Sequence, residues 1–164
     1  MEYINIGRIV NTHGIKGEVR ILSDFKYKNK IFKEGKNIYI GKSKDQEVIK
    51  SYRYHKIFDM ITMDGINNIN DVLKYKGKYV YTTRDELDLD KFEYLDDDFV
   101  GLNVLVNGEQ VGVVSHYLHD KYQDKIVVNK NEKEYLVPVV CDIIEDINLK
   151  KGTISIKDIK GLLD

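Results

Sequence analysis

The sequence predicts a mostly β protein made of two small β-barrels. Apolar residues alternate with polar ones in many short runs, which is typical of half-buried strands. The chain has one proline among its 164 residues, so Gly, Asn and Asp must supply its turns. An acidic stretch divides the strands into two sets of about 80 and 65 residues, and sets of this size favour two barrels over one sandwich.

The first set contains six expected strands joined by short connections. We expect them at residues 3–10, 18–22, 37–41, 48–57, 58–63 and 78–82. Between the first two, residues 13–17 interrupt the alternation. This predicts a tight turn in which Gly14 or Gly17 has a positive φ.

One short helix is expected in the first set, near residues 69–76. Asn68 can cap its start and Gly77 can end it. Its apolar face is expected to hold Ile69, Val72 and Leu73.

Residues 84–97 are expected to form an acidic linker between a domain at 1–83 and a domain at 98–164. Eight of the fifteen residues from Arg84 to Asp98 are acidic, and few of the others are suited to packing. Second-domain strands are expected at residues 102–106, 111–114, 126–128, 134–137 and 153–157. Asn107–Gly108 predicts a type I′ hairpin turn between the first two of them.

The aliphatic residues around the single proline are expected to build the second core. They are Val139, Ile143, Ile147, Leu149, Ile154 and Ile156. The tail at residues 161–163 is expected to pack outside this core. Cys141 is expected to be a buried and inert thiol, because no cation or histidine lies near it in the sequence.

The net charge of −1 hides a division of the chain. Residues 1–83 carry 16 Lys and Arg against 9 Asp and Glu, a net charge of +7, and residues 84–164 carry 10 against 18, a net charge of −8. This asymmetry indicates two modules with different partners. A compositional bias of the coding sequence is the alternative, since 22 of the 26 cations are lysine.

Several classes of function are excluded by what the sequence lacks. No apolar run approaches the about 20 residues of a membrane helix, the first residues do not resemble a secretory signal, and one cysteine cannot form an intramolecular disulfide. We therefore expect a cytoplasmic protein without membrane contact. His116, His119 and Asp120 hint at a metal pair, but spacing supplies no third ligand. No nucleophile elbow, phosphate loop or dinucleotide fingerprint is present, so we expect no enzyme activity, no metal and no cofactor.

Basic and aromatic residues in the first domain predict binding to looped or single-stranded RNA. Cations flank the expected turn at 13–17, and lysines then alternate with Phe25, Tyr27 and Phe32. The candidate RNA-binding residues are Arg8, His13, Lys16, Arg20, Lys26, Lys28 and Lys30. The alternative is an exposed loop whose rings simply pack on the barrel.

Residues 7–21, Gly-Arg-Ile-Val-Asn-Thr-His-Gly-Ile-Lys-Gly-Glu-Val-Arg-Ile, resemble the N-terminal signature of the RimM family of ribosome maturation factors. Residues 135–140, 148–156 and 161–163 resemble that family's closing motifs. The resemblance implies a translation-factor-like barrel joined to a PRC-type barrel. It also implies a non-enzymatic factor that assists maturation of the 30S head and 16S rRNA processing. Its partners would be ribosomal protein S-nineteen, the immature 30S subunit and nearby 16S rRNA. We expect the chain to be a monomer.

At the start of the second domain the chain departs from the family pattern of two adjacent tyrosines. Tyr94 matches the first, Leu95 replaces the second, and Asp98 and Phe99 fit positions that follow. Of the rings, the resemblance carries over Tyr94 alone. Because charge cannot supply specificity, we expect an apolar patch near Tyr94 and Phe99 to anchor the ribosomal protein, which makes Tyr94, Asp98 and Phe99 the candidates for this contact. A general RNA-binding or protein-interaction module is the alternative, and an rRNA-processing enzyme would need a catalytic constellation that the sequence does not show.

Overall fold

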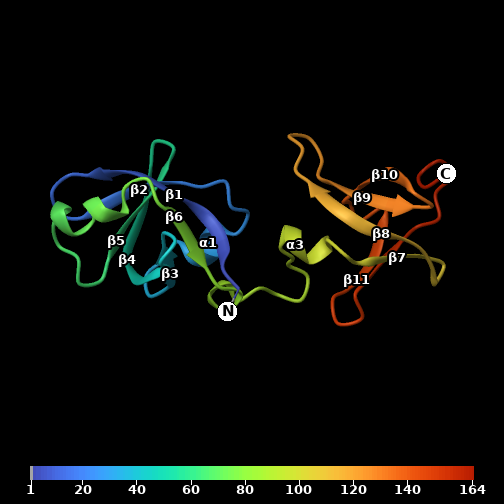
Figure 1. The fold of residues 1–164 in the computed structure, drawn as a ribbon, viewed down its shortest axis with the longest axis horizontal. Helices are drawn as coiled ribbons and strands as arrows, with labels where there is room; N and C mark the ends of the chain where they lie inside the picture. Colours follow the sequence, from blue (N-terminus) through green and yellow to red (C-terminus); the bar gives the residue numbers. More distant parts are fainter. Residues whose placement is uncertain (1) are drawn as a thin grey trace. The chain divides into compact units, whose positions relative to one another are not determined.

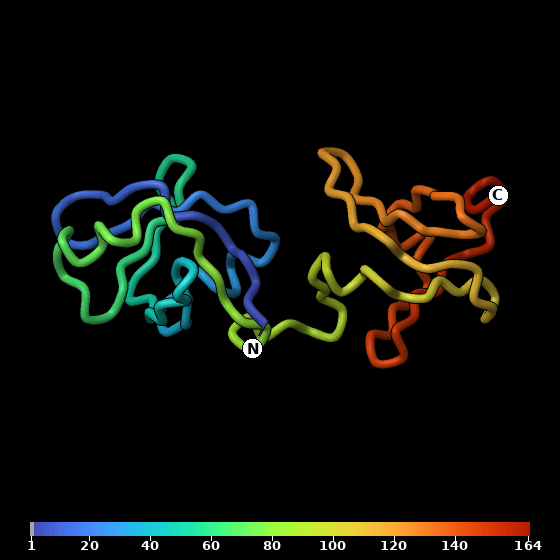
Figure 2. Tube along the Cα trace, in the orientation of Figure 1, coloured from blue at the N-terminus to red at the C-terminus, as the bar shows by residue number. Residues whose placement is uncertain are grey.

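The computed structural model describes residues 2–164, which form two compact units divided between Asp90 and Lys91 (Figure 1). The chain completes the first unit before it enters the second (Figure 2). Each unit has its own sheet and its own buried residues, so the prediction of a mostly β chain with two β domains is confirmed. No helix within residues 2–164 is long and apolar enough to cross a membrane.

The first unit is a closed antiparallel barrel, and all six predicted strands are present. They are β1 (Ile4–His13), β2 (Glu18–Leu22), β3 (Asn37–Ile40), β4 (Asp45–His55), β5 (Phe58–Met63) and β6 (Tyr79–Thr82). Their order around the barrel is β1-β2-β5-β4-β3-β6. Ile9, Val19, Ile38, Ile61 and Val80 are fully buried. Because alternate residues face inward, the side chains between them lie on the outer face.

A one-turn helix, α1 (Lys28–Ile31), lies between β2 and β3. Tyr27, Ile31 and Phe32 are buried. The Phe32 ring stacks on Tyr52 of β4, with 6.0 Å between the centroids and 7° between the planes. The apolar residues of this segment therefore pack against the barrel.

The short helix predicted near residues 69–76 is present as two 3₁₀ turns, η1 (Ile69–Asp71) and η2 (Leu73–Tyr75). As predicted, Asn68 caps the first, since its side-chain oxygen accepts from the backbone N of Asp71 at 3.3 Å. The predicted face is right for Val72, which is buried together with Tyr75, and wrong for Leu73, which is 50% exposed. In a 3₁₀ turn residues three apart share a face, which pairs Val72 with Tyr75.

The segment expected to be a linker, residues 84–97, contains α2 (Arg84–Leu87) and the start of α3 (Asp96–Phe99). Leu87 is fully buried in the first unit. Both carboxylate oxygens of Glu86 accept from Asn37 at the start of β3, at 3.0 and 2.9 Å. With the division at Asp90, the net charges become +4 for residues 1–90 and −5 for residues 91–164. The charge contrast keeps its sign but is smaller than the sequence division implied.

The second unit is a six-stranded sheet in the order β10-β9-β8-β7-β12-β11. Its strands are β7 (Asn103–Val106), β8 (Glu109–Leu118), β9 (Lys125–Lys130), β10 (Lys133–Pro138), β11 (Ile144–Asn148) and β12 (Thr153–Ile156). Only the β7–β12 pair is parallel. The predicted hairpin joins β7 to β8, with a φ of 52° at Asn107. The sequence pattern missed β11, because an irregularity between Ile144 and Asp146 breaks its alternation.

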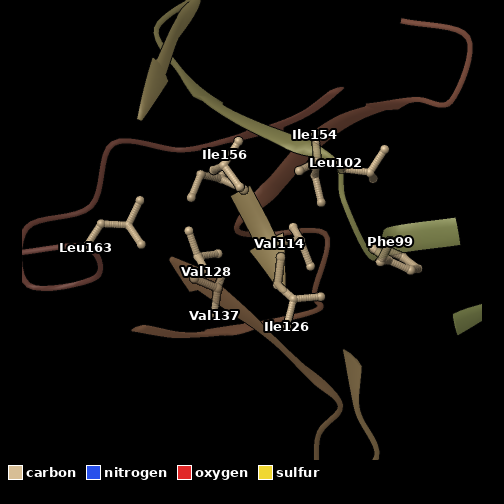
Figure 3. Packing of buried hydrophobic residues seen from close by; sticks show 10 residues of the cluster. Phe99, Leu102, Val114, Ile126, Val128, Val137, Ile154, Ile156 and Leu163 are labelled. Carbon is tan, nitrogen blue, oxygen red and sulfur yellow. The ribbon is translucent and has the colours of Figure 1, made fainter. Parts of the chain in front are cut away.

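The core of the second unit draws on most of its strands and on α3 (Figure 3). Its buried residues are Phe99, Leu102, Val104, Val114, Ile126, Val128, Val137, Ile154, Ile156 and Leu163. Of the predicted core, Ile154 and Ile156 are buried, and Val139, Ile143 and Ile147 are partly buried against them.

Three predictions about this core are wrong. Leu149 is 39% exposed, because it lies at the turn between β11 and β12. Cys141 is exposed. Leu163 belongs to the core, with 8% of its surface exposed, instead of packing outside it. The Lys130 ammonium donates to the Leu163 carbonyl at 2.9 Å and holds the tail against the sheet.

Candidate nucleic-acid and protein interfaces

The turn between β1 and β2 presents its tip to solvent. Gly14 and Gly17 have φ values of 68° and 92°. Ile15 is 77% exposed, and Lys16 is exposed beside it. The backbone N of Ile69 donates to the Ile15 carbonyl at 2.9 Å. The turn is therefore anchored to η1 through its backbone, which leaves the Ile15 and Lys16 side chains available to a partner.

His13 and Arg20, which sequence reasoning placed on either side of this turn, are in direct contact. Arg20 Nη2 lies 2.7 Å from His13 Nδ1. The guanidinium carbon lies 5.7 Å from the centroid of the Phe58 ring. Because a guanidinium only donates, Nδ1 is the acceptor, and the neutral His13 ring carries its proton on Nε2.

Sequence reasoning missed three charged or titratable residues beside this pair, Glu18, Arg53 and His55. Arg53 binds Glu18 with two hydrogen bonds, at 2.9 Å from Nε and 2.7 Å from Nη2. These bonds hold the pKa of Glu18 below its usual value, against the opposing effect of burial. The His55 ring lies 6.1 Å from the His13 ring. We call His13, Glu18, Arg20, Arg53 and His55 the outer cluster.

The basic segment at residues 26–36 is largely engaged with its own domain. Lys28 Nζ lies 2.9 Å from Oδ2 of Asp59, which is fully buried. Lys30 Nζ donates to the carbonyl of Asp88 at 3.1 Å. Lys26 keeps an exposed side chain. Of the three lysines predicted here to bind RNA, Lys26 is therefore the most available.

The rings of the same segment are mostly covered. Tyr27 is 7% exposed and Phe32 is 3% exposed, so neither can stack on a base. Phe25 packs edge-on against Tyr27, with 6.1 Å between the centroids. For these rings the alternative interpretation, packing on the barrel, fits the structure better than base stacking.

A second group is a row of tyrosines with two cations on β1, β3 and β6 and the adjoining segments, and of this group sequence reasoning named only Arg8. Its members are Tyr3, Tyr39, Tyr79, Tyr81, Arg8 and Lys44. Tyr39 pairs with Tyr81 across the β3–β6 ladder. Lys44 Nζ lies 4.1 Å from the Tyr81 centroid, and Arg8 lies 5.8 Å from that of Tyr79. Arg8 thus belongs to this row and not to the β1–β2 turn.

In the second unit, two of the three candidates for protein contact serve the fold. Phe99 is 5% exposed and lies in the core, 5.0 Å from the Tyr117 ring. Asp98 Oδ2 accepts from the backbone N of Leu95 at 2.9 Å and caps α3. Tyr94 is half-buried against Phe99, at 5.9 Å between centroids. Burial and then the nearby acidic charges raise the pKa of Tyr94.

The histidine that hinted at a metal pair is engaged with acids on other elements. His119 Nε2 pairs with Asp96 of α3, and its Nδ1 lies 3.4 Å from Asp124 Oδ2. Burial lowers the pKa of His119, but the hydrogen bond and charge of Asp96, with those of Asp124, outweigh it and raise the value. Asp120 pairs instead with Lys125, at 2.7 Å. Within residues 2–164, no group of three or more His, Cys, Asp or Glu is arranged to hold a metal ion.

Comparison with known proteins accounts for both units. Residues 4–87 match the model of the RimM N-terminal domain, and residues 96–162 match that of the RimM PRC barrel domain. A ribosome maturation factor RimM from Staphylococcus haemolyticus is 40% identical over 166 residues, covering 98% of this chain and 99% of that protein. One from Geobacillus kaustophilus is 34% identical over 169 residues, covering 99% and 97%. With both domains matched in order over almost the whole length, the chain belongs to the RimM family of ribosome maturation factors.

Proposed function

We propose that this protein is a non-enzymatic assembly factor for the small ribosomal subunit, which assists maturation of the 30S head and processing of 16S rRNA. The observation that carries the proposal is the match of both family domains, residues 4–87 and 96–162, with relatives named as ribosome maturation factors. The outer cluster and the tyrosine row are suited to binding a partner more than to catalysis. A general RNA-binding module unconnected to subunit assembly is the competing function.

The two units divide the partners by charge. The first unit carries +4 and holds the outer cluster and the tyrosine row, which suit phosphates and bases of 16S rRNA. The second unit carries −5 and suits a basic ribosomal protein, S-nineteen, while repelling RNA phosphates.

Within the second unit, Tyr94 is the aromatic anchor of the protein contact. Its ring is half-buried, so its remaining surface can pack against a partner with little loss of side-chain freedom. Exposed Asp97 lies close by in α3 and supplies negative charge. Phe99 supports this surface from the core and does not itself touch the partner.

The test is co-sedimentation of the full chain with small subunits. We expect association with immature subunits from cells that lack the factor and little association with mature ones. Equal binding to both would favour the general RNA-binding module.

A titration of the full chain with protein S-nineteen tests the division of partners. Tyr94→Ala should weaken binding about tenfold or more, as expected for an aromatic anchor. Tyr122→Ala, a change at an 87% exposed ring of the same unit, is the matched control. Unaltered affinity in Tyr94→Ala would contradict the anchor.

A further inference from the structure

The outer cluster is a built layer on the first barrel. Val19 and Ile21 on either side of Arg20 are fully buried, so Arg20 faces outward from β2. Met60 of β5 pairs in register with Arg20 on one side and with Arg53 on the other. It shares their outward face and yet is fully buried. The cluster therefore covers Met60 and holds its side chains in defined positions.

Arg20 lacks an anionic partner within this layer. Its Nε is buried and has no hydrogen-bond partner among residues 2–164. Both carboxylate oxygens of Glu18, the acid of the cluster, are taken by Arg53. A partly buried cation is normally paired with an anion. An anion from outside the chain would complete the arrangement.

The two histidines supply further donors at the same place. Because Nδ1 of His13 accepts from Arg20, its N–H lies on Nε2 and is available to another acceptor. His55 lies 6.1 Å away, ring to ring, and adds a second imidazole. A guanidinium fork and imidazole N–H groups are suited to phosphate oxygens.

Flanking residues favour a ligand with several phosphates. The turn after His13 exposes Lys16, and the turn after His55 exposes Lys56. Each lysine has an exposed isoleucine beside it, Ile15 at 77% and Ile57 at 63%. Additional cations suit the neighbouring phosphates of a nucleic-acid backbone, and exposed apolar side chains suit its sugars and bases.

We propose that the outer cluster is a phosphate-binding site for an RNA backbone. Arg20, His13 and His55 hold one phosphodiester, and Lys16 and Lys56 hold neighbouring ones. Arg53 and Glu18 are positioning residues that keep the layer in place. The proposal rests on the proposed function in one respect, that RNA is the ligand of the first unit.

The test titrates the full chain with a labelled single-stranded RNA oligonucleotide taken from the 16S head. Arg20→Gln should lower the affinity about tenfold or more and reduce the slope of log affinity against log salt by about one. Lys42→Gln, which removes the same charge from an exposed turn of the same barrel, should change the affinity less than about twofold. In the wild-type chain, the ring resonances of His13 and His55 should shift when the oligonucleotide is added.

Because Arg20 covers Met60, thermal unfolding of each variant accompanies the titration, and His55→Gln provides a second variant at the edge of the layer. RNA affinity equal to wild type in both variants would overturn the site. Histidine shifts with inorganic phosphate, but none with the oligonucleotide, would overturn the assignment to RNA. A wild-type chain that binds the oligonucleotide through this cluster but does not join immature subunits would overturn the proposed function and leave the site intact.

Discussion

Replacing Lys28 by Gln tests whether the basic segment serves the fold or the ligand. Lys28 Nζ lies 2.9 Å from Oδ2 of the fully buried Asp59, and the Tyr52 hydroxyl donates to Oδ1 at 2.6 Å. Burial and this hydrogen bond to Asp59 raise the pKa of Tyr52, so the hydroxyl remains a donor at neutral pH. Without the ammonium, a buried carboxylate would lose its opposite charge.

The magnitude follows from the burial of the two partners. Breaking a fully buried ion pair costs about 3–5 kcal/mol, because one charge stays behind without its partner. The Lys28 side chain is 31% exposed, so water screens the pair in part. We expect Lys28→Gln to lower the free energy of unfolding of the first unit by about 2 kcal/mol. Adding Asp59→Asn removes the orphaned charge and should recover about 1 kcal/mol.

The assay is urea denaturation followed by amide signals of each unit, with the second unit as internal control. RNA affinity of the folded Lys28→Gln variant should stay within about twofold of wild type, apart from the general effect of one charge. A change in stability below about 0.5 kcal/mol, together with a tenfold loss of RNA affinity, would show that Lys28 contacts the ligand and would refute the structural role.

Four further variants test the turn, the tail and the histidine. A Cβ at Gly17 would lie 3.0 Å from a side-chain carbon of Ile66, whereas a Cβ at Gly14 would meet no atom within 4 Å. In urea denaturation, Gly17→Ala should therefore lower the free energy of unfolding by about 2–3 kcal/mol and Gly14→Ala by about 1 kcal/mol. Leu163→Ala should destabilise the second unit alone, by about 2 kcal/mol. Burial lowers the pKa of His119, but its acidic neighbours outweigh burial and raise the pKa in the folded protein. The protonated ring therefore stabilises the fold at pH values below the pKa of the unfolded chain. This contribution is lost as the pH rises through the pKa of the folded protein. His119→Gln should therefore lower the melting temperature more at about pH 5.5 than at about pH 8.5, and an equal loss at both would contradict this.

Local patterns were enough to predict most of the strands. Alternation is a property of neighbouring residues, and it held from Glu18 to Leu22 and from Asn37 to Ile40. Strand alternation failed to predict β11, where a register irregularity breaks the two-residue period. The α-helical period likewise failed to predict the buried face of residues 69–75, because they form 3₁₀ turns. Burial of Leu163 was also missed, because it depends on packing with core residues that lie far from the tail in the sequence.

The candidate site was only half predictable. His13 and Arg20 flank one turn, so the sequence alone pointed to their proximity. Arg53 and His55 lie on β4, and they reach the same place only because β5 and then β4 follow β2 around the barrel. Strand order depends on closure of the whole barrel, and no local pattern in the chain encodes it.

A run of cations in a sequence does not by itself form a basic surface, because in the folded protein a cation can be neutralised by an acidic side chain. In this chain Lys28 meets Asp59, Lys36 meets Asp88 at 3.2 Å, and Arg53 meets Glu18. Pairing of this kind removes much of the positive field of residues 26–36. Arg20 keeps a buried Nε that has no hydrogen-bond partner in the described part of the chain, residues 2–164. It is therefore a stronger candidate than any of the paired cations, although its neighbourhood is less rich in positive charge. For this family member, the outer cluster is therefore where contact with rRNA is expected first.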